Sequence, residues 1–354
     1  MPITSPLLKP TILHFHITSR CPYRCKHCCS RAGASDTETH LALREIKKMV
    51  DQAFKLGVEV FEVSGGEPTI LDRHFLLAVL DYASQKGLLT VLNTNGFKLT
   101  GEFATQLVKA GLNKIKLSLY GILPETNDEF TGFHGSFEKT VNGIKVAKSV
   151  GIEVGLHCVI TPRNLDEMLN LPRLLEPYEV DVVQLSSVIP TGRGAVASEY
   201  ILSNVEGAKA IEALRTRYSE SLDRSYFFTT ALYPESAADL LKERFCNYLS
   251  ERVVVDSEGN VIACCLIPED LRKPLGNIRE ESLNNIYSLQ RIKQNPLTYW
   301  LLKGHKAIMD VLAYEESSHC LCCICIKMLR QLNHKYFNIK KKQQKSANNE
   351  RCKP

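Results

Sequence analysis

The sequence predicts an α/β fold in which strand–helix units repeat along the chain and build a parallel sheet. From about residue 11 to residue 190, short β-rich runs alternate with helical stretches, and the connections between them are short. Several helical stretches stop at a residue that tolerates the left-handed helix C-cap, namely Gly57, Gly87, Gly111 and Gly151. Six such units are fewer than the eight that close a TIM barrel, so we expect a partial (β/α)6 TIM barrel that stays open.

The predicted elements follow one another in a regular order. The six strands cover residues 12–17, 58–63, 88–93, 114–119, 153–160 and 181–187. The helices between them cover residues 41–56, 72–86, 103–110, 137–150 and 165–175. In folds of this kind the reactive site lies at the C-terminal ends of the strands, so we expect the functional residues in the loops that follow them.

The chain changes character after the sixth strand. Residues 204–220 are predicted to be helical, and a hairpin is predicted from strands 252–256 and 260–264, followed by helical segments at 282–303 and 305–315. We therefore expect four parts: a barrel (1–200), a helical linker (201–239), a small α+β domain (240–337) and a basic disordered tail (338–354).

The composition indicates a cytoplasmic protein. Lys and Arg number 44 against 39 Asp and Glu, and part of this small excess lies in the tail, so nucleic-acid binding is not favoured. No run is long enough to span a membrane, and the N-terminus does not resemble a signal peptide. Reducing conditions disfavour structural disulfides, so the 13 cysteines need another role. Their clustering at 21–29, 264–265 and 320–325 favours metal ligation.

The first cysteine group lies on the loop that leaves the first strand. Cys21, Cys25 and Cys28 have the spacing C-x3-C-x2-C, which suits three irons of a [4Fe–4S] cube and leaves the fourth iron without a protein ligand. That iron can take the amino and carboxylate groups of S-adenosylmethionine (SAM), and one electron would then release a 5′-deoxyadenosyl radical. A zinc site is the alternative, but it requires four ligands, so Cys29 or His27 would have to join.

Residues 19–28, SRCPYRCKHC, resemble the signature of the radical SAM superfamily, with His27 where the family usually has an aromatic residue. The stretch after the second strand is similar to the family's GGEP element. The resemblance implies that this element binds the amino group of SAM through Gly65, Gly66, Glu67 and Pro68. Glycines at a strand end leave backbone amides and carbonyls uncovered, which suits close backbone approach.

Two further strand ends resemble family elements that contact SAM. The resemblance places Asn95, after the third strand, and Ser118, at the end of the fourth, near the SAM ribose and carboxylate. Tyr120 stands where the family often has Asp, and an Arg that relatives often carry near Thr131 is absent. The loop at 188–194 resembles another family loop, although a polar turn explains its Arg193 equally well.

The second cysteine set resembles the auxiliary-cluster domain called SPASM, or its shorter form called twitch. Cys246 is followed by a Gly-x4-Cys unit that ends at Cys264, and Cys320 and Cys323 come much later. The resemblance implies one auxiliary [4Fe–4S] cluster with four thiolate ligands, acting as an electron relay or a structural staple. Cys322 and Cys325 offer a competing pair, and a zinc site built from the same four residues is a further alternative.

Cys265 has no ligand role in this scheme. The run at 262–265 resembles the radical SAM peptide epimerases that make D-residues in epipeptides, and the chain shares with them the double cysteine Cys28-Cys29. The resemblance implies that the Cys265 thiol gives a hydrogen atom to a substrate Cα radical from the opposite face. An inert buried thiol is the alternative. His14, His16, Cys29 and Cys158 are expected to have packing or structural roles.

The resemblance implies a radical SAM enzyme that modifies a ribosomally made precursor peptide, most specifically by Cα epimerisation. A reductant such as flavodoxin or ferredoxin would supply electrons. No separate peptide-recognition domain is expected before the barrel, so a leader would dock elsewhere or be unnecessary. The alternatives are a radical SAM dehydrogenase or a thioether or carbon–carbon cross-linking maturase. A non-catalytic zinc or iron–sulfur scaffold is the alternative from another class.

Overall fold

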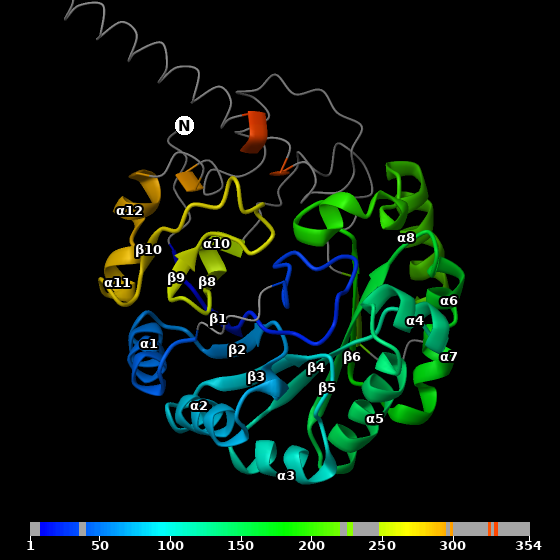
Figure 1. Cartoon of the computed structure of the whole chain (residues 1–354), viewed down its shortest axis with the longest axis horizontal. Helices are drawn as coiled ribbons and strands as arrows, with labels where there is room; N and C mark the ends of the chain where they lie inside the picture. Colours follow the sequence, from blue (N-terminus) through cyan, green and yellow to red (C-terminus); the bar gives the residue numbers. More distant parts are fainter. Residues whose placement is uncertain are drawn as a thin grey trace, which may run out of the picture.

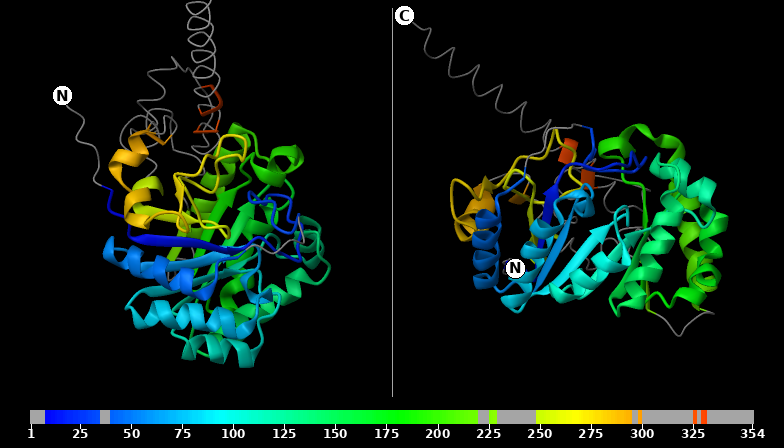
Figure 2. Two further views of the ribbon diagram at one scale, coloured as in Figure 1. Left: turned by 60° about the vertical axis from the view of Figure 1, so that its left-hand side comes forward. Right: turned by 60° about the horizontal axis from the view of Figure 1, so that its bottom comes forward.

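The computed structural model describes residues 8–34, 40–219, 225–228, 248–294, 298–299, 325–326 and 329–331. Within them, one curved sheet of ten strands has the order β10-β9-β8-β1-β2-β3-β4-β5-β6-β7. Helices α1, α2, α3, α5, α6 and α7 lie along the outer side of this sheet (Figures 1 and 2). No helix in these ranges is long and apolar enough to cross a membrane.

The strands are β1 (Ile12–Thr18), β2 (Val60–Gly65), β3 (Leu89–Thr94), β4 (Lys114–Ser118), β5 (Glu153–Ile160), β6 (Val182–Ser187), β7 (Ser225–Phe228), β8 (Arg252–Val255), β9 (Asn260–Ile262) and β10 (Gly276–Asn277). The helices are α1 (Leu43–Lys55), α2 (Arg73–Gln85), α3 (Gly101–Lys109), α4 (Pro124–Thr131), α5 (Ser136–Ser149), α6 (Leu165–Leu169), α7 (Leu171–Leu175), α8 (Asn204–Ser219), α10 (Tyr248–Glu251), α11 (Leu283–Ile286) and α12 (Leu289–Gln294).

The partial barrel predicted from the sequence is confirmed. All six expected strands are present, and the four helix-ending glycines have φ between 79° and 90°, as a left-handed C-cap requires. The predicted helix at 165–175 is divided into α6 and α7, with Pro172 in the first turn of α7, where its missing N–H is tolerated. Helix α4 was not expected from the sequence.

Two more parallel strands extend the sheet beyond the six predicted. β7 pairs with β6, and it lies in the stretch that was expected to be a helical linker. β8 pairs with β1 from Ile12↔Arg252 to Phe15↔Val255, and the predicted hairpin is formed by β8 and β9. The C-terminal segment therefore continues the barrel sheet at its β1 edge.

The two faces of the sheet differ in polarity because side chains alternate along each strand. On β1, Leu13, Phe15 and Ile17 are fully buried in the main apolar core, whereas His14 and His16 between them are only partly buried. The same alternation occurs on β4 and β6. The concave face of the sheet consequently carries polar side chains.

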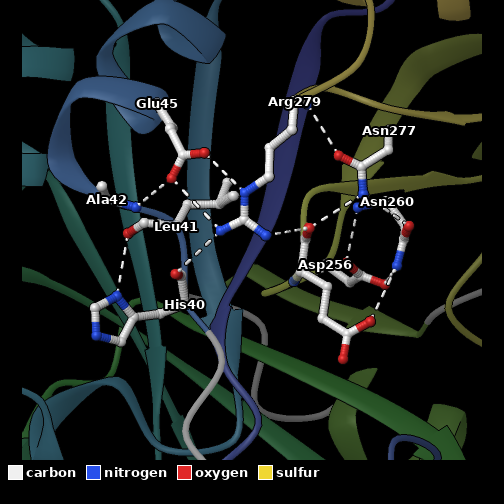
Figure 3. Close-up of polar contacts among 9 residues, drawn as sticks. His40, Leu41, Ala42, Glu45, Asp256, Asn260, Asn277 and Arg279 are labelled. Atoms are coloured by element: carbon white, nitrogen blue, oxygen red, sulfur yellow. Dashed lines mark hydrogen bonds and ion pairs between the residues drawn. The ribbon is translucent and has the colours of Figure 1, made fainter.

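The C-terminal segment is also fixed to the barrel through α1 (Figure 3). Arg279 Nε donates a hydrogen bond to Glu45 Oε1 at 2.7 Å, and Arg279 Nη1 donates to the Glu258 carbonyl at 3.1 Å. Glu45 also accepts a hydrogen bond from the Ala42 amide at the start of α1. This arginine joins the helix N-terminus to the β8–β9 turn.

Candidate active site

The loop after β1 carries the three predicted cluster ligands across the concave side of the sheet (the blue loop in Figure 1). Cys21, Cys25 and Cys28 are partly exposed and form no disulfide. Two backbone bonds tie the loop to the end of α4: Arg24 N to the Thr131 carbonyl at 2.8 Å, and Lys26 N to the Phe130 carbonyl at 2.9 Å. The loop is therefore held by the barrel on both sides of Cys25.

The chemistry of these thiols fits an iron–sulfur cluster. Burial raises the pKa of Cys21 to about 12, and burial also raises the pKa of Cys25. A thiolate in such a place requires nearby positive charge, which ligated iron supplies. Among the described residues, no three potential ligands converge closely enough to share one ion. Each thiolate of a cube binds its own iron, so such convergence is not required.

His27, which the sequence analysis singled out in the cluster loop, packs as an aromatic residue. Its ring stacks on Phe130 with centroids 5.2 Å apart and planes 10° apart, and it lies 4.7 Å from Tyr120. Burial lowers the pKa of His27 to about 3, so the ring is neutral. Its Nδ1 atom is buried without a hydrogen-bond partner in the described structure.

The Gly65-Gly66 pair lets the end of β2 pass against the start of the cluster loop. Gly66 N donates to the Thr18 carbonyl at 2.6 Å, and Glu67 N donates to the Arg20 carbonyl at 2.8 Å. Gly65 has φ of 120°, and a Cβ on Gly66 would lie 1.9 Å from the Arg20 carbonyl oxygen. Neither position tolerates a side chain without displacing the chain that leads into Cys21.

Glu67 is fully buried and holds the loops after β2 and β3 together through hydrogen bonds. Its Oε1 accepts hydrogen bonds from Thr69 Oγ1 at 2.6 Å and Thr94 Oγ1 at 2.5 Å, and its Oε2 accepts from Asn95 N at 2.7 Å. Both carboxylate oxygens are thus engaged by the protein, and Pro68 begins the short helix that follows. The side chain connects the ends of β2 and β3.

Asn95 and Ser118 lie at neighbouring strand ends. Asn95 Nδ2 approaches Cys21 Sγ at 3.8 Å, while its Oδ1 accepts from Phe97 N at 3.0 Å. Ser118 ends β4, and its carbonyl accepts a hydrogen bond from Thr140 Oγ1 at 3.0 Å. The roles of both residues toward SAM stay predictions.

Arg193 holds the cluster loop in place, a role that the sequence left open. Its Nε donates to the Cys25 carbonyl at 2.8 Å, its Nη1 donates to the Ala32 carbonyl at 3.1 Å, and its amide donates to the Cys28 carbonyl at 2.9 Å. The loop after β6 therefore clamps the cluster loop through its backbone.

Cys265 belongs to the C-terminal segment and faces the cluster loop. Its sulfur contacts the Tyr248 hydroxyl at 3.2 Å and forms side-chain hydrogen bonds with Cys264, Cys29 and His16. When Cys264 is protonated, hydrogen bonds from Cys264 and Cys29 lower the pKa of Cys265. The hydrogen bond between Cys29 and Cys265, together with burial, raises the pKa of Cys29. The residue expected only to pack, Cys29, is thus a direct neighbour of the candidate hydrogen donor.

His14 extends this contact network into the sheet. Its Nδ1 lies 3.1 Å from the Tyr248 hydroxyl, and its Nε2 lies 2.6 Å from Ser64 Oγ. Burial lowers the pKa of His14 to about 4, so it is neutral at neutral pH.

A buried carboxylate lies on the concave face beside His14. Glu62 is 5% exposed and pairs with Lys116 Nζ at 2.8 Å and Arg252 Nη1 at 2.6 Å. It also accepts a hydrogen bond from Asn93 Nδ2 at 3.0 Å. Burial alone would raise the pKa of Glu62, but the positive charges of Lys116 and Arg252 hold it well below its usual range.

The auxiliary-cluster ligands are only partly within the described structure. Cys264 follows β9 and packs against the main core, as does Cys325. The predicted ligands Cys246, Cys320 and Cys323, and the competing Cys322, lie outside the described residues. The ligand set therefore stays a prediction, with both later pairs open.

The sequence analysis did not identify Tyr248, Glu62, Lys116 and Arg252 as parts of the site. Two of them, Glu62 and Lys116, share a recognisable pattern, because each is a charged residue in a strand with an apolar residue on either side. Such a residue has to face the concave side of the sheet. Tyr248 has no comparable pattern, since only the fold brings α10 to β1.

Two protein-family models match the chain. The radical SAM superfamily model matches residues 15–175, and the model of the iron–sulfur cluster-binding domain called SPASM matches residues 246–325. These matches agree with the predicted cofactors, which are SAM, a SAM-binding [4Fe–4S] cluster and an auxiliary cluster.

Several curated proteins are similar in sequence. Fe-coproporphyrin III synthase of Methanosarcina barkeri is 32% identical over 209 residues, which are 59% of this chain and 51% of that protein. PqqA peptide cyclase of Rhizobium meliloti is 32% identical over 179 residues, 50% of this chain and 47% of that protein. Mycofactocin maturase MftC of Mycobacterium tuberculosis is 28% identical over 257 residues, 72% of this chain and 64% of that protein. The chain spans about half the length of the synthase and the cyclase.

Solved structures share the fold. Streptococcus suis SuiB bound to S-adenosylmethionine superposes with a TM-score of 0.69 at 16% identity, over 89% of this chain and 77% of that one. Native anSMEcpe with bound AdoMet gives a TM-score of 0.64 at 17% identity, over 93% and 98%. With the cysteine loop, the barrel and both domain matches in agreement, the chain contains a radical SAM superfamily domain and a SPASM-type iron–sulfur cluster-binding domain.

Proposed function

We propose that this protein is a radical SAM enzyme that inverts a Cα centre in a ribosomally made precursor peptide. The observation that carries the proposal is the position of Cys265. Its thiol contacts Cys29, the residue that directly follows the predicted cluster ligand Cys28. This contact supports a hydrogen-donating thiol beside the cluster loop, where the substrate radical is proposed to form.

The cluster and SAM, when bound, supply a 5′-deoxyadenosyl radical that can remove the substrate Cα hydrogen. Cys21, Cys25 and Cys28 hold the cluster, the Gly65-Gly66 turn and Glu67 shape the SAM side of the loop, and Arg193 fixes the loop backbone. Cys265 returns a hydrogen atom to the opposite face of Cα.

Cys265 must be protonated to donate a hydrogen atom. When Cys264 binds the auxiliary cluster as a thiolate, it no longer offers a proton to Cys265. Thiolate charge beside Cys265 then favours the neutral S–H form. Ligation of Cys264 therefore prepares its neighbour for hydrogen-atom donation.

The comparisons support a peptide substrate. One relative is named a PqqA peptide cyclase, and SuiB, whose fold this chain shares, has been solved bound to the precursor peptide SuiA. The polar concave face, with His157 Nε2 at 2.8 Å from Ser186 Oγ, offers hydrogen-bonding groups that suit a peptide backbone. A flavodoxin or ferredoxin is the proposed electron donor.

A radical SAM oxidation is the second candidate. Fe-coproporphyrin III synthase and AdoMet-dependent heme synthases, among the most similar relatives, favour a tetrapyrrole substrate, and the cyclase favours cross-linking. In either case the auxiliary cluster would accept the substrate electron, and Cys265 would not be needed to donate hydrogen.

The test uses anaerobically reconstituted full-length protein, reductant, SAM and, as peptide, the product of a short reading frame beside the gene. Epimerisation predicts 5′-deoxyadenosine, about eight irons per chain from two four-iron clusters, and solvent deuterium at Cα without net oxidation. Oxidation predicts a product lighter by two hydrogens. Bound zinc without SAM cleavage would instead indicate a scaffold protein.

Two cysteine variants sharpen this test. Cys265→Ala should still cleave SAM but should not invert Cα. Cys158→Ala is the matched control, because Cys158 is buried on the helix-facing side of β5 and should leave inversion intact. Normal inversion by Cys265→Ala would remove Cys265 from the mechanism.

A further inference from the structure

A continuous chain of hydrogen-bonding groups runs from Cys265 into the sheet. Cys265 Sγ lies 3.2 Å from the Tyr248 hydroxyl, which lies 3.1 Å from His14 Nδ1, and His14 Nε2 lies 2.6 Å from Ser64 Oγ. These four residues come from the loop after β9, from α10, from β1 and from β2. Only the folded barrel brings them together, since Tyr248 and His14 are 234 positions apart.

The proposed reaction creates a need for such a chain. When Cys265 gives its hydrogen atom to Cα, its sulfur is left as a thiyl radical. The next inversion cannot proceed until that sulfur regains both an electron and a proton. Cys265 is partly exposed, and a side chain in direct contact with its sulfur can supply both within the folded protein.

We propose that Tyr248 restores the hydrogen atom of Cys265 after each inversion, an assignment that rests on the proposed epimerase function. The substrate Cα radical takes the hydrogen of the Cys265 S–H bond, and a thiyl radical remains. The thiyl takes the hydrogen of the Tyr248 O–H bond, which leaves a tyrosyl radical and a complete thiol.

The cycle closes with one electron and one proton. The electron comes from the same one-electron iron–sulfur or flavin reductant that reduces the SAM-binding cluster. The proton moves from His14 Nδ1 to the Tyr248 oxygen, and His14 is reprotonated from water through Ser64. Each inversion thus consumes one SAM and two electrons, and it takes one proton from solvent.

Tyr248 is better placed for this step than Cys29, the neighbouring thiol from the cluster loop. Hydrogen transfer from Cys29 would only move the thiyl radical from Cys265 to a second sulfur. The Tyr248 hydroxyl, in contrast, contacts both the sulfur and a histidine that leads away from it. A phenol also combines a stable radical form with an O–H bond similar in strength to S–H.

The experiment separates the first inversion from later ones. Full-length wild-type protein, Tyr248→Phe and Tyr287→Phe are each given excess peptide, SAM and reduced flavodoxin in deuterium oxide, without added thiol. Tyr287 is the matched control: it is a buried tyrosine of the same segment, and its hydroxyl donates to the Leu249 carbonyl. Deuterated D-residues are counted per chain over time.

We expect Tyr248→Phe to make its first D-residue at the wild-type rate, because the resting thiol is already complete. It should then stop at about one per chain, whereas wild type and Tyr287→Phe continue for many turnovers. Continued turnover by Tyr248→Phe would overturn the assignment. If the wild type itself makes no D-residue, the epimerase proposal fails first, and the role of Tyr248 fails with it.

A second measurement covers the case in which Tyr248→Phe fails to fold or to load iron. Wild-type protein containing ring-deuterated tyrosine is freeze-quenched during turnover and examined by electron paramagnetic resonance. The proposal predicts an organic radical whose signal narrows with the deuterated ring. A turnover radical that is insensitive to tyrosine labelling would contradict it.

Discussion

The side-chain amide of Asn95 points at the sulfur of Cys21, with Nδ2 and Sγ 3.8 Å apart. The amide is held in this orientation because its oxygen accepts the Phe97 amide hydrogen. Hydrogen bonds to cluster sulfurs help to set the reduction potential of iron–sulfur clusters. If Cys21 holds the cluster, this contact is expected to stabilise its more negative, reduced form.

Asn95→Ser should therefore lower the reduction potential of the SAM-binding cluster. Serine retains a side-chain oxygen that can accept the Phe97 amide hydrogen, but it loses the amide donor. Loss of one hydrogen bond worth ~0.5–1.5 kcal/mol corresponds to about 20–60 mV for one electron. A redox titration followed by electron paramagnetic resonance measures the potential. An unchanged or higher potential would show that Asn95 does not tune the cluster.

Arg193→Ala should make the cluster easier to lose. The substitution removes the two side-chain hydrogen bonds that hold the carbonyls of Cys25 and Ala32. Iron release to a chelator should become several-fold faster, because such charge-assisted bonds contribute ~1.5–3 kcal/mol each. Arg163→Ala is the control, since that arginine pairs with Glu129 at the surface. Equal release rates in the two variants would contradict the clamp.

His27→Phe should load as much iron as the wild type and should be at least as stable. Phenylalanine keeps the stack on Phe130 and removes the unpartnered Nδ1 atom, whose burial costs about 1–3 kcal/mol. Iron content and the denaturation midpoint measure the two effects. His27→Lys, which buries a charge at the same place, should load less iron; equal loading would show that the position is not buried against the loop.

Glu62→Gln should destabilise the protein at neutral pH by ~3 kcal/mol, because it leaves Lys116 and Arg252 without their anion. The pKa of Glu62 is lower in the folded state than the ~4.3 of an unfolded chain. Its contribution is therefore fully present above about pH 4.3 and declines as the pH falls toward the folded pKa.

Chemical denaturation at several pH values checks this sign. The difference between wild type and Glu62→Gln should shrink as the pH falls below about 4. Glu102→Gln, at an exposed ion pair with Arg73, should show little difference at any pH. If the stability difference between wild type and Glu62→Gln grew as the pH fell, the Glu62 carboxylate would not be stabilised by Lys116 and Arg252.

The barrel was predictable from the sequence because each of its elements is specified by residues close together in the chain. Strand-like runs, helical stretches and the glycines that end them each depend on a few neighbouring residues, and the six strands appeared where expected. The cluster loop was identified in the same way, from the spacing of Cys21, Cys25 and Cys28. Their role as ligands stays a prediction.

The contacts that join distant segments were not predictable. Arg193 could have been an ordinary turn residue until the fold placed it against the Cys25 carbonyl. The strand pairing of β8 with β1 depends on which edge of the sheet remains open, and no local pattern encodes that choice. Cys265 and Cys29 were each noticed in the sequence, but their contact depends on this pairing.

The pairing of β8 with β1 has a consequence for dissecting the protein. A barrel fragment that ends before residue 248 would leave β1 with a free row of backbone donors and acceptors, next to the loop that carries the four free thiols of Cys21, Cys25, Cys28 and Cys29. Such a bare edge invites strand exchange between molecules, and the thiols could then cross-link the resulting aggregates. The barrel and the cluster-binding segment should therefore be produced and studied as a single cooperative unit.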